Sequence, residues 1–446
     1  MKYIEQVKSV VLFLLVFLSL GLTFTIWTFT PTTLAPIEPS PAIDTAVGET
    51  KKIEQVVRPM KVLYHSEESA KGTVNEDEIE LFMNSMRQWQ ISDLNLQTDE
   101  ATADEMADIM HDPSRAVLYY PGAVPFPVFD TLNLMDISDT NIPEATFNRL
   151  VVNWESAANG ELVIYFVNSD SGRIYEGIVQ INEMVNFEES IIEPAEQYPL
   201  YITDESIGIL PIYVPAEPVD STSYVYLYEE TPLEEYADGL FAGSAEPASS
   251  LMDGGYTDNT GAFLEKESSV KGLNFVQSKA ETADPAIPSE LVFNTINFIN
   301  DHGGWTNEYR YFGMEPINQE IEYRLFINNL PVFGSSVSTA IDVQWGMADG
   351  EEQVFRYDRP IYVLESTGRT VDKEQASGTV VLSALSRLDE EEKAGVTEIM
   401  PGYELVRSSN DPDRLVIVEP TWYFKVDGTW LKLSNEVLGG GPFGLE

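Results

Sequence analysis

Residues 150–180, LVVNWESAANGELVIYFVNSDSGRIYEGIVQ, decide the fold class of this chain. Apolar side chains take every second position in the first two segments, at Leu150, Val152, Trp154, Leu162, Ile164 and Phe166. Alternation with a period of two is typical of a strand with one buried face, and a third apolar segment follows at 174–179. Asn159-Gly160 favours a two-residue hairpin, and Ser171-Gly172 marks the next turn. The stretch therefore predicts an antiparallel meander of three strands.

The segments before the meander predict two further strands and a helix. Apolar runs at Met60–Tyr64 and Ala116–Tyr120 are typical of strands. A helix is expected from Asn75, with one apolar stripe formed by Ile79, Phe82, Met83, Met86 and Trp89. Asn75 followed by Glu78 resembles a capping box. Residues 49–56, which are more polar than the proline-containing stretch before them, begin an element.

The segments after the meander predict helices that alternate with antiparallel strands. A strand is expected at Tyr224–Tyr228 and an acidic helix from Pro232. The next helix, Ser289–Asn300, carries a stripe of Val292, Ile296 and Ile299 and ends at Gly303-Gly304. Strands then alternate at Ile321, Tyr323, Leu325 and Ile327, and at Ile341, Val343 and Trp345.

The last hundred residues repeat this order of a helix followed by strands. The second helix places Val381, Leu385 and Leu388 on one face. Separate strands are expected at Leu415–Val418, Trp422–Val426 and Trp430–Leu433, with a tight turn at Asp427-Gly428. Helices segregated from antiparallel strands predict an α+β architecture.

Residues 1–30 add a membrane span to this architecture. Ser9–Phe29 is 21 residues without a charge, and about 20 apolar residues suffice for a helix to cross a bilayer. Lys2 and Lys8 precede the span, which places the N-terminus in the cytoplasm and the bulk of the chain outside. Tyr3 and Trp27 lie near its ends, where aromatic side chains favour the headgroup layer.

A cleaved signal peptide is the alternative interpretation of this segment. Signal h-regions run about 7–15 residues and end at an A-x-A-like site. This segment is longer, and the nearby Ala35 is followed by Pro36. The chain also contains no cysteine, which excludes a lipid-modified cysteine and every disulfide. An uncleaved single-pass anchor in the cell membrane is therefore expected.

The predicted organisation is a single N-terminal transmembrane helix and an extracytoplasmic region of about three small α+β domains. The predicted boundaries are 1–8 for the cytoplasmic N-terminus, 9–29 for the transmembrane helix, 30–56 for a linker, 57–195 for an N-terminal ectodomain, 196–283 for a central domain and 284–446 for a C-terminal helix-plus-antiparallel-sheet domain.

Charge and residue patterns exclude several classes of function. The formal net charge of −47 repels nucleic acid, so no nucleic-acid partner is expected. The three histidines, His65, His111 and His302, lack metal-ligand spacing and are expected at the surface or at helix ends. Ser268–Lys271 matches S-x-x-K, but the other elements of that acyl-enzyme chemistry do not occur. We therefore expect no catalytic, metal or cofactor-binding residues and no cofactor.

Small residues in the span are the candidate binding site. Ser19 and Thr23, and likewise Gly21 and Thr25, are spaced four residues apart. Small residues at this spacing let the backbones of membrane helices approach closely. They predict a seam for packing against another transmembrane helix, although small residues facing the outer leaflet also tolerate lipid.

Two stretches resemble the YycH (WalH) family. They are MKYIEQVKSVVLFLLVFLSLGLTFTIWTFTP at 1–31 and YRLFINNLPVF at 323–333. The resemblance implies three small α+β domains, of which the later ones are like YycI (WalI). It also implies a non-enzymatic regulator that contacts the sensor histidine kinase YycG (WalK) and YycI and modulates an essential cell-wall two-component system. The greater acidity of this chain departs from the family pattern.

These observations predict a membrane-anchored extracytoplasmic regulator of a histidine kinase. The alternative is an anchored cell-wall hydrolase or a protein that binds a wall polymer, which requires a concave site with convergent carboxylates of split pKa.

Overall fold

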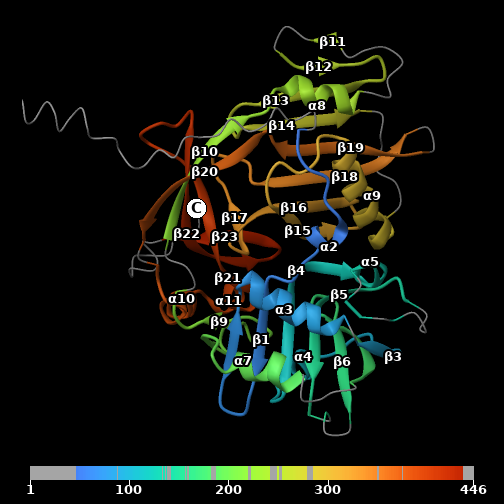
Figure 1. The fold of residues 1–446 in the computed structure, drawn as a ribbon, viewed down its shortest axis with the longest axis vertical. Helices are drawn as coiled ribbons and strands as arrows, with labels where there is room; N and C mark the ends of the chain where they lie inside the picture. The colour runs from blue at the N-terminus through green and yellow to red at the C-terminus, as the bar shows by residue number, and fades with distance from the viewer. Residues whose placement is uncertain are drawn as a thin grey trace, which may run out of the picture. The chain divides into compact units, whose positions relative to one another are not determined.

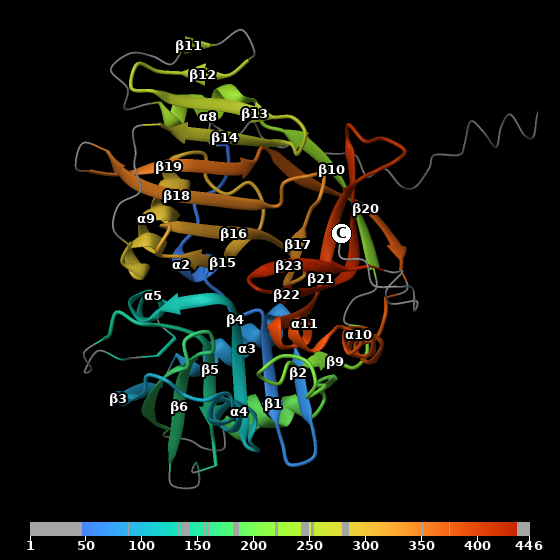
Figure 2. The ribbon, with the colours of Figure 1, turned by 180° about the vertical axis from the view of Figure 1, so that it is seen from behind.

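Two large sheets form the frame of the described residues, which lie between 47 and 434, in the computed structural model (Figures 1 and 2). The structure describes residues 47–434 except 88, 133, 136, 138–141, 156, 158–159, 182–186, 219–221, 242–248, 251–253, 279–284, 349–350 and 374. Both views show the first sheet, in blue to green, below the second, whose strands run from green at β10 through yellow to red.

Within these residues, the first sheet has nine strands in the order β3-β7-β6-β5-β4-β1-β2-β8-β9. Its strands are β1 (Lys61–His65), β2 (Ala70–Thr73), β3 (Gln90–Thr98), β4 (Arg115–Pro125), β5 (Thr146–Asn153), β6 (Glu161–Asn168), β7 (Arg173–Gln180), β8 (Leu200–Ile202) and β9 (Val214–Pro215). The order along the described part of the second sheet is β11-β12-β13-β14-β19-β18-β16-β17-β21-β22-β10-β20, with β15 beside β16 and β23 beside β22.

The strands of the second sheet are β10 (Thr222–Glu230), β11 (Ser249–Ser250), β12 (Tyr256–Thr257), β13 (Ala262–Glu267), β14 (Gly272–Gln277), β15 (Tyr309–Glu315), β16 (Glu320–Ile327), β17 (Leu330–Phe333), β18 (Ala340–Ala348), β19 (Glu351–Pro360), β20 (Tyr362–Asp372), β21 (Val396–Arg407), β22 (Leu415–Val426) and β23 (Thr429–Leu433). The helices are α2 (Ile53–Val56), α3 (Glu76–Met86), α4 (Ala103–His111), α5 (Phe126–Thr131), the π-helical turn η2 (Glu188–Ile192), α7 (Glu193–Ala195), α8 (Leu233–Leu240), α9 (Pro288–Asp301), α10 (Gly378–Leu385) and α11 (Glu390–Gly395). Helices combined with mainly antiparallel strands confirm the α+β prediction.

The three-strand meander is confirmed as β5, β6 and β7, but the predicted two-residue hairpin at Asn159-Gly160 is wrong. Strand β5 ends at Asn153 and β6 begins at Glu161. Pairing with β6 ends at Asn153, which lies opposite Val163, whereas the Trp154 N–H donates to the Ser114 carbonyl at 3.1 Å, in register with the β4–β5 pairing. The connection therefore runs from 154 to 160, and Gly160, with φ +80°, returns it to β6.

The predicted cap of α3 is half right. The Asn75 side chain accepts hydrogen bonds from the amides of Asp77 and Glu78 at 3.0 and 3.2 Å. The Glu78 carboxylate does not reach back to Asn75 but accepts a hydrogen bond from the Thr73 hydroxyl, and that hydroxyl accepts one from the Asn75 amide. The members of the predicted stripe are buried, but the helix ends at Met86, so Trp89 lies beyond it.

Strand β22 is one continuous strand where two were predicted, at Leu415–Val418 and Trp422–Val426. On one side it pairs along its length with β21. On the other side β10 pairs with 415–418 and β23 with 422–426. Pro420 lies between these two pairings, where neither β10 nor β23 pairs with β22. The Asp427-Gly428 turn is confirmed, with φ of +48° and +81°.

Helix α9 follows the sequence prediction closely. Val292, Ile296 and Ile299 are buried on its inner face. Gly303 and Gly304 follow it with φ of +105° and +63°, a conformation that favours glycine.

The polypeptide of 196–283 contributes to both sheets. Strands β8 and β9 extend the first sheet, whereas β10 and β11–β14 belong to the second. The main buried apolar cluster likewise includes side chains from both sheets. The predicted domain boundaries stay predictions.

The predicted transmembrane helix, 9–29, lies outside the described residues. In the part of the chain that the structure does describe, no helix combines the length and apolar character that crossing a bilayer requires.

Candidate functional site

Buried charge joins the two sheets. Arg149 of β5 donates to the carboxylate of Glu398 of β21, with Nη2 to Oε2 at 2.7 Å, and Lys61 of β1 lies 3.7 Å from the other carboxylate oxygen. The three side chains are between 7% and 12% exposed. Both cations also lie over the ring of Tyr119, at 4.3 Å for Lys61 and 4.5 Å for Arg149. One carboxylate thus balances two cations at the junction.

The pKa of Lys61 reflects this imbalance. Its pKa is lowered to about 8, because burial, which lowers the pKa most, and the charge of Arg149 together outweigh the attraction of Glu398, which raises it. Its ammonium group also donates to the Tyr213 carbonyl at 3.3 Å. The lysine is therefore held by one charged and one neutral acceptor.

A second contact between the sheets is built on Asn329. Asn328 and Asn329 adopt φ of +50° and +61° in the turn between β16 and β17, a conformation that asparagine tolerates. The Asn329 amide donates to the carbonyls of Met60 and Val74 at 3.1 and 2.7 Å, and its oxygen accepts a hydrogen bond from Arg310. Arg310 in turn lies 3.0 Å from Glu76 at the start of α3. The Asn-Asn pair between two apolar runs was a local signal of this turn that our sequence reasoning missed.

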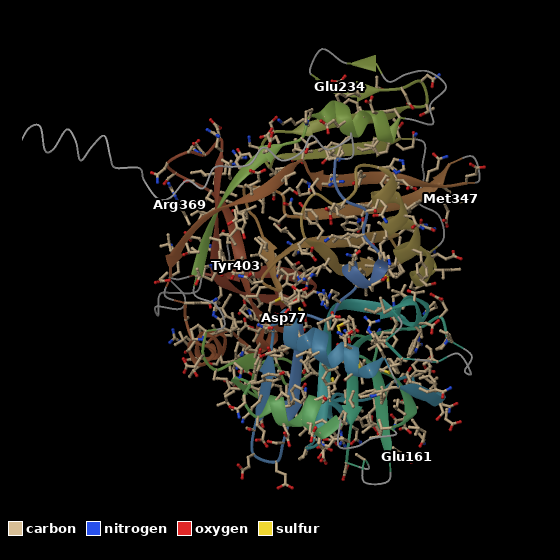
Figure 3. All side chains as sticks on the ribbon, in the orientation of Figure 1. Asp77, Glu161, Glu234, Met347, Arg369 and Tyr403 are labelled. Atoms are coloured by element: carbon tan, nitrogen blue, oxygen red, sulfur yellow. The ribbon has the colours of Figure 1, made fainter. Side chains whose placement is uncertain are left out.

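The backbones of the two sheets approach closely where β4 meets β15. A Cβ added to Gly122 would lie 2.6 Å from the Cα of Gly313 and 2.7 Å from the carbonyl oxygen of Phe312. Beside this contact, the Tyr311 hydroxyl donates to the Ala123 carbonyl at 2.5 Å. Figure 3 shows Tyr403 of β21 and Asp77 at the start of α3 near this boundary, with Glu161 and Glu234 at opposite ends of the molecule.

We expect Gly122→Ala to destabilise the protein by about 1–3 kcal/mol, the usual cost of inserting a methyl group into a filled space. The obstructing atoms are backbone, so the sheets must shift to make room. Gly313→Ala is the matched control, because a Cβ there meets no described atom within 4 Å beyond its chain neighbours. Urea unfolding of the full chain in detergent measures the change in the free energy of unfolding for each variant. Equal changes for Gly122→Ala and Gly313→Ala would contradict the close approach of the two backbones.

Two histidines meet beside the junction. The rings of His65, at the end of β1, and His111, at the end of α4, are 4.9 Å apart, and each lies 4.9 Å from the ring of Tyr213. His111 also contacts the Tyr119 hydroxyl at 3.4 Å, which links this group to the ring beneath the two cations. The expectation of a surface or helix-end position is wrong for His65, which is buried in the sheet, and correct for His111 and His302.

Burial keeps both histidines uncharged. It lowers the pKa of His65 to about 4, and the charge of Lys61 adds to the effect. Burial likewise lowers the pKa of His111 to about 3, with further contributions from His65, Arg149 and Lys61. Among the described residues, no group of three or more potential ligands could hold a metal ion.

The residues that the sequence analysis considered for catalysis or helix packing do not belong to this junction between the sheets. Lys271 of the S-x-x-K match forms an ion pair with Glu230 at 2.6 Å. The predicted helix-packing residues Ser19, Gly21, Thr23 and Thr25, and the topology residues Lys2, Tyr3, Lys8 and Trp27, lie outside the described residues. Their roles stay predictions.

Comparison with known proteins identifies the family. The model of the YycH protein, N-terminal domain, matches residues 5–193, and that of the YycH protein, C-terminal domain, matches residues 211–437. The chain belongs to the YycH family. The Two-component system WalR/WalK regulatory protein YycH of Bacillus subtilis (strain 168) is 24% identical over 459 residues, which cover 97% of each chain.

A solved YycH structure shares this fold. The crystal structure of YycH from Bacillus subtilis superposes with a TM-score of 0.69 at 18% identity, covering 87% of this chain and 99% of that one. The predicted family and the prediction of a regulatory protein rather than an enzyme are confirmed.

Proposed function

We propose that this YycH-family chain is a membrane-anchored extracytoplasmic regulator of a sensor histidine kinase of the WalK (YycG) type, acting together with a YycI (WalI) protein. The observation that carries the proposal is similarity over 97% of the chain to a protein named as a regulator of the WalR/WalK system. The uncharged stretch at 9–29 supports a single-pass location in the cell membrane with a cytoplasmic N-terminus.

The ectodomain has the physical properties of a transmitting element. Buried ion pairs, the Asn329 hydrogen bonds and a shared apolar cluster join its two sheets. If a bound partner displaces one sheet, these contacts transmit the displacement to the other sheet. Differential contacts worth about 1–3 kcal/mol are sufficient to bias a kinase between two states.

The finer organisation is also a proposal. It divides the ectodomain at 57–195, 196–283 and 284–446, with the last part similar to YycI. The span contributes the seam of Ser19, Gly21, Thr23 and Thr25, through which the anchor packs against a kinase helix.

The proposal is tested by replacing two small residues of this seam with leucine. Gly21→Leu/Thr25→Leu adds bulk where backbones must approach, so we expect recovery of the kinase with the tagged full chain to fall several-fold after detergent extraction. Val11→Leu/Val16→Leu changes two residues of the same span that are already large, and it should leave recovery unchanged. Equal recovery of the kinase with both double variants would contradict a role for Gly21 and Thr25 in packing against it.

A further inference from the structure

The first described residues, 47–52, dock on the corner between α9 and β15 before the chain reaches the first sheet. Glu49 and Trp305 form an antiparallel bridge. The Trp305 N–H donates to the Glu49 carbonyl at 2.8 Å, and the Glu49 N–H donates to the Trp305 carbonyl at 3.2 Å. Helix α2 follows and lies next to β15 in both ribbon views (Figures 1 and 2). We name residues 47–52 the leading segment; the chain enters the first sheet only after it, at Lys61.

Asn300, near the end of α9, holds the leading segment through both of its polar groups. Its side-chain oxygen accepts hydrogen bonds from the Lys51 amide at 2.9 Å and from the Trp305 indole N–H at 2.8 Å. Its side-chain NH₂ group donates to the Lys51 carbonyl at 2.9 Å. The Lys51 ammonium group also forms an ion pair with Glu308 at 2.6 Å. Because an asparagine side chain is both donor and acceptor, it pairs with this extended backbone as a neighbouring strand would.

Two glycines allow the backbones to approach at this corner. A Cβ added to Gly48 would lie 2.6 Å from the carbonyl carbon and oxygen of Trp305, and one added to Gly304 would lie 2.6 Å from the Gly48 carbonyl oxygen. The obstructing atoms are backbone, so no side-chain rotation makes room. Gly304 has φ of +63°, whereas Gly48 is not in the left-handed region. At Gly48, therefore, only the docked contact requires a glycine.

A buried arginine lies behind the docking corner. Arg359 of β19 is 1% exposed, and the described residues supply no ion pair to it. Its four hydrogen-bond acceptors are all neutral: the carbonyl oxygens of Gly304 and Pro360 and the hydroxyl oxygens of Tyr357 and Thr306. The Gly304 carbonyl, which accepts at 2.9 Å, belongs to the same peptide group as the Trp305 N–H. The cation polarises this peptide group and so strengthens the hydrogen bond from Trp305 to Glu49.

The leading segment has little apolar surface to hold it in place. Val47 is its one apolar side chain and packs against the main apolar cluster, while Glu49, Thr50 and Lys52 are exposed. A segment held mainly by hydrogen bonds near solvent opens at a lower cost than a packed core does. This attachment can therefore break while both sheets stay folded.

We propose that the leading segment is a reversible latch on the α9–β15 corner. When it is docked, a displacement that arrives along the chain from its N-terminal side acts first on the second sheet. When it is released, the slack in the freed segment absorbs part of that displacement. The latch does not depend on the proposed function, whereas its use in regulating a kinase rests on that function.

Gly48→Ala tests the latch, because the added methyl group obstructs the docked state alone. Hydrogen–deuterium exchange of the full chain in nonionic detergent, followed by mass spectrometry, measures the protection of the Glu49 and Trp305 amides. We expect their exchange to quicken at least tenfold in Gly48→Ala, and likewise in Asn300→Ala, which removes the side-chain hydrogen bonds to Lys51. Exchange of β5 and β6 should remain within twofold of the wild type.

Thr50→Ala is the control, since it changes an exposed side chain of the same segment and should leave the exchange of both amides within twofold. In the wild type, the Glu49 and Trp305 amides should exchange faster than those of β5 and β6. If Gly48→Ala behaves as Thr50→Ala does, the close contact does not hold the segment. If β5 and β6 quicken together with the segment, it is a fixed part of the core. Either result would overturn the latch, and neither depends on which protein the chain regulates.

Discussion

Replacing Glu398 by glutamine should destabilise the protein by about 3–5 kcal/mol, the usual effect of removing one partner from a buried ion pair. The substitution leaves the charges of Arg149 and Lys61 within the junction with no carboxylate to balance them. Both side chains are about one-tenth exposed or less, so solvent compensates only in part for the lost anion. Urea unfolding of the full chain in detergent measures the change.

Glu404→Gln is the matched control for this prediction. It removes the same kind of group from the same strand, but its partner Lys432 is 42% exposed. Solvent screens such a pair, so the expected loss is at most about 1 kcal/mol. Similar losses of stability for Glu398→Gln and Glu404→Gln would show that the buried charges of the junction stabilise the protein no more than an exposed ion pair does.

Acid should weaken the folded protein through the two buried histidines. Between pH 6.5 and pH 4 a histidine in the unfolded chain binds a proton, whereas His65 and His111, with pKa values of about 4 and about 3, remain unprotonated. The unfolded state binds more protons in this window, so stability falls as the pH falls. Each histidine contributes about 1.4 kcal/mol per pH unit, so the pair accounts for several kcal/mol.

The His65→Gln/His111→Gln variant isolates this effect from that of the carboxylates. It keeps polar side chains at both positions but removes their titration. Urea unfolding at pH 7, 6, 5 and 4.5 should give a shallower decline for the variant than for the wild type. Parallel declines would show that other groups cause the acid sensitivity.

The local elements of the fold could be predicted from the sequence because each has a local cause. The meander follows from alternating side chains, α9 from its buried stripe and closing glycines, and the β22–β23 turn from Asp427-Gly428. Errors occurred where a distant partner overrode the local pattern. Trp154 stays in register with β4, at the Ser114 carbonyl, after the pairing with β6 has ended, and the pairing with β21 continues through Pro420, so β22 is one strand.

The junction could not be predicted in this way. Arg149 and Glu398 are separated by 249 residues, and a chain with 73 acidic residues offers no means of choosing one of them as the partner. Asn328-Asn329 is different, since the pair was a turn signal that could have been used.

These features support one physical account of the molecule. Buried charges and hydrogen bonds join the two sheets, and in the proposed function the span brings the joined sheets to a kinase. In the proposed function, the junction determines whether the two sheets move as a unit, and the span determines which protein receives that movement.

The most direct test of the central proposal is photo-crosslinking in native membranes, with a photoreactive residue in place of Leu22, beside the predicted seam. We expect the crosslinked product to contain the chain and a sensor histidine kinase, identified by mass spectrometry, and to disappear with Gly21→Leu/Thr25→Leu. Recovery of lipid adducts alone, or of a protein that begins downstream of Pro31 and is free in the medium, would contradict a kinase regulator anchored through this helix.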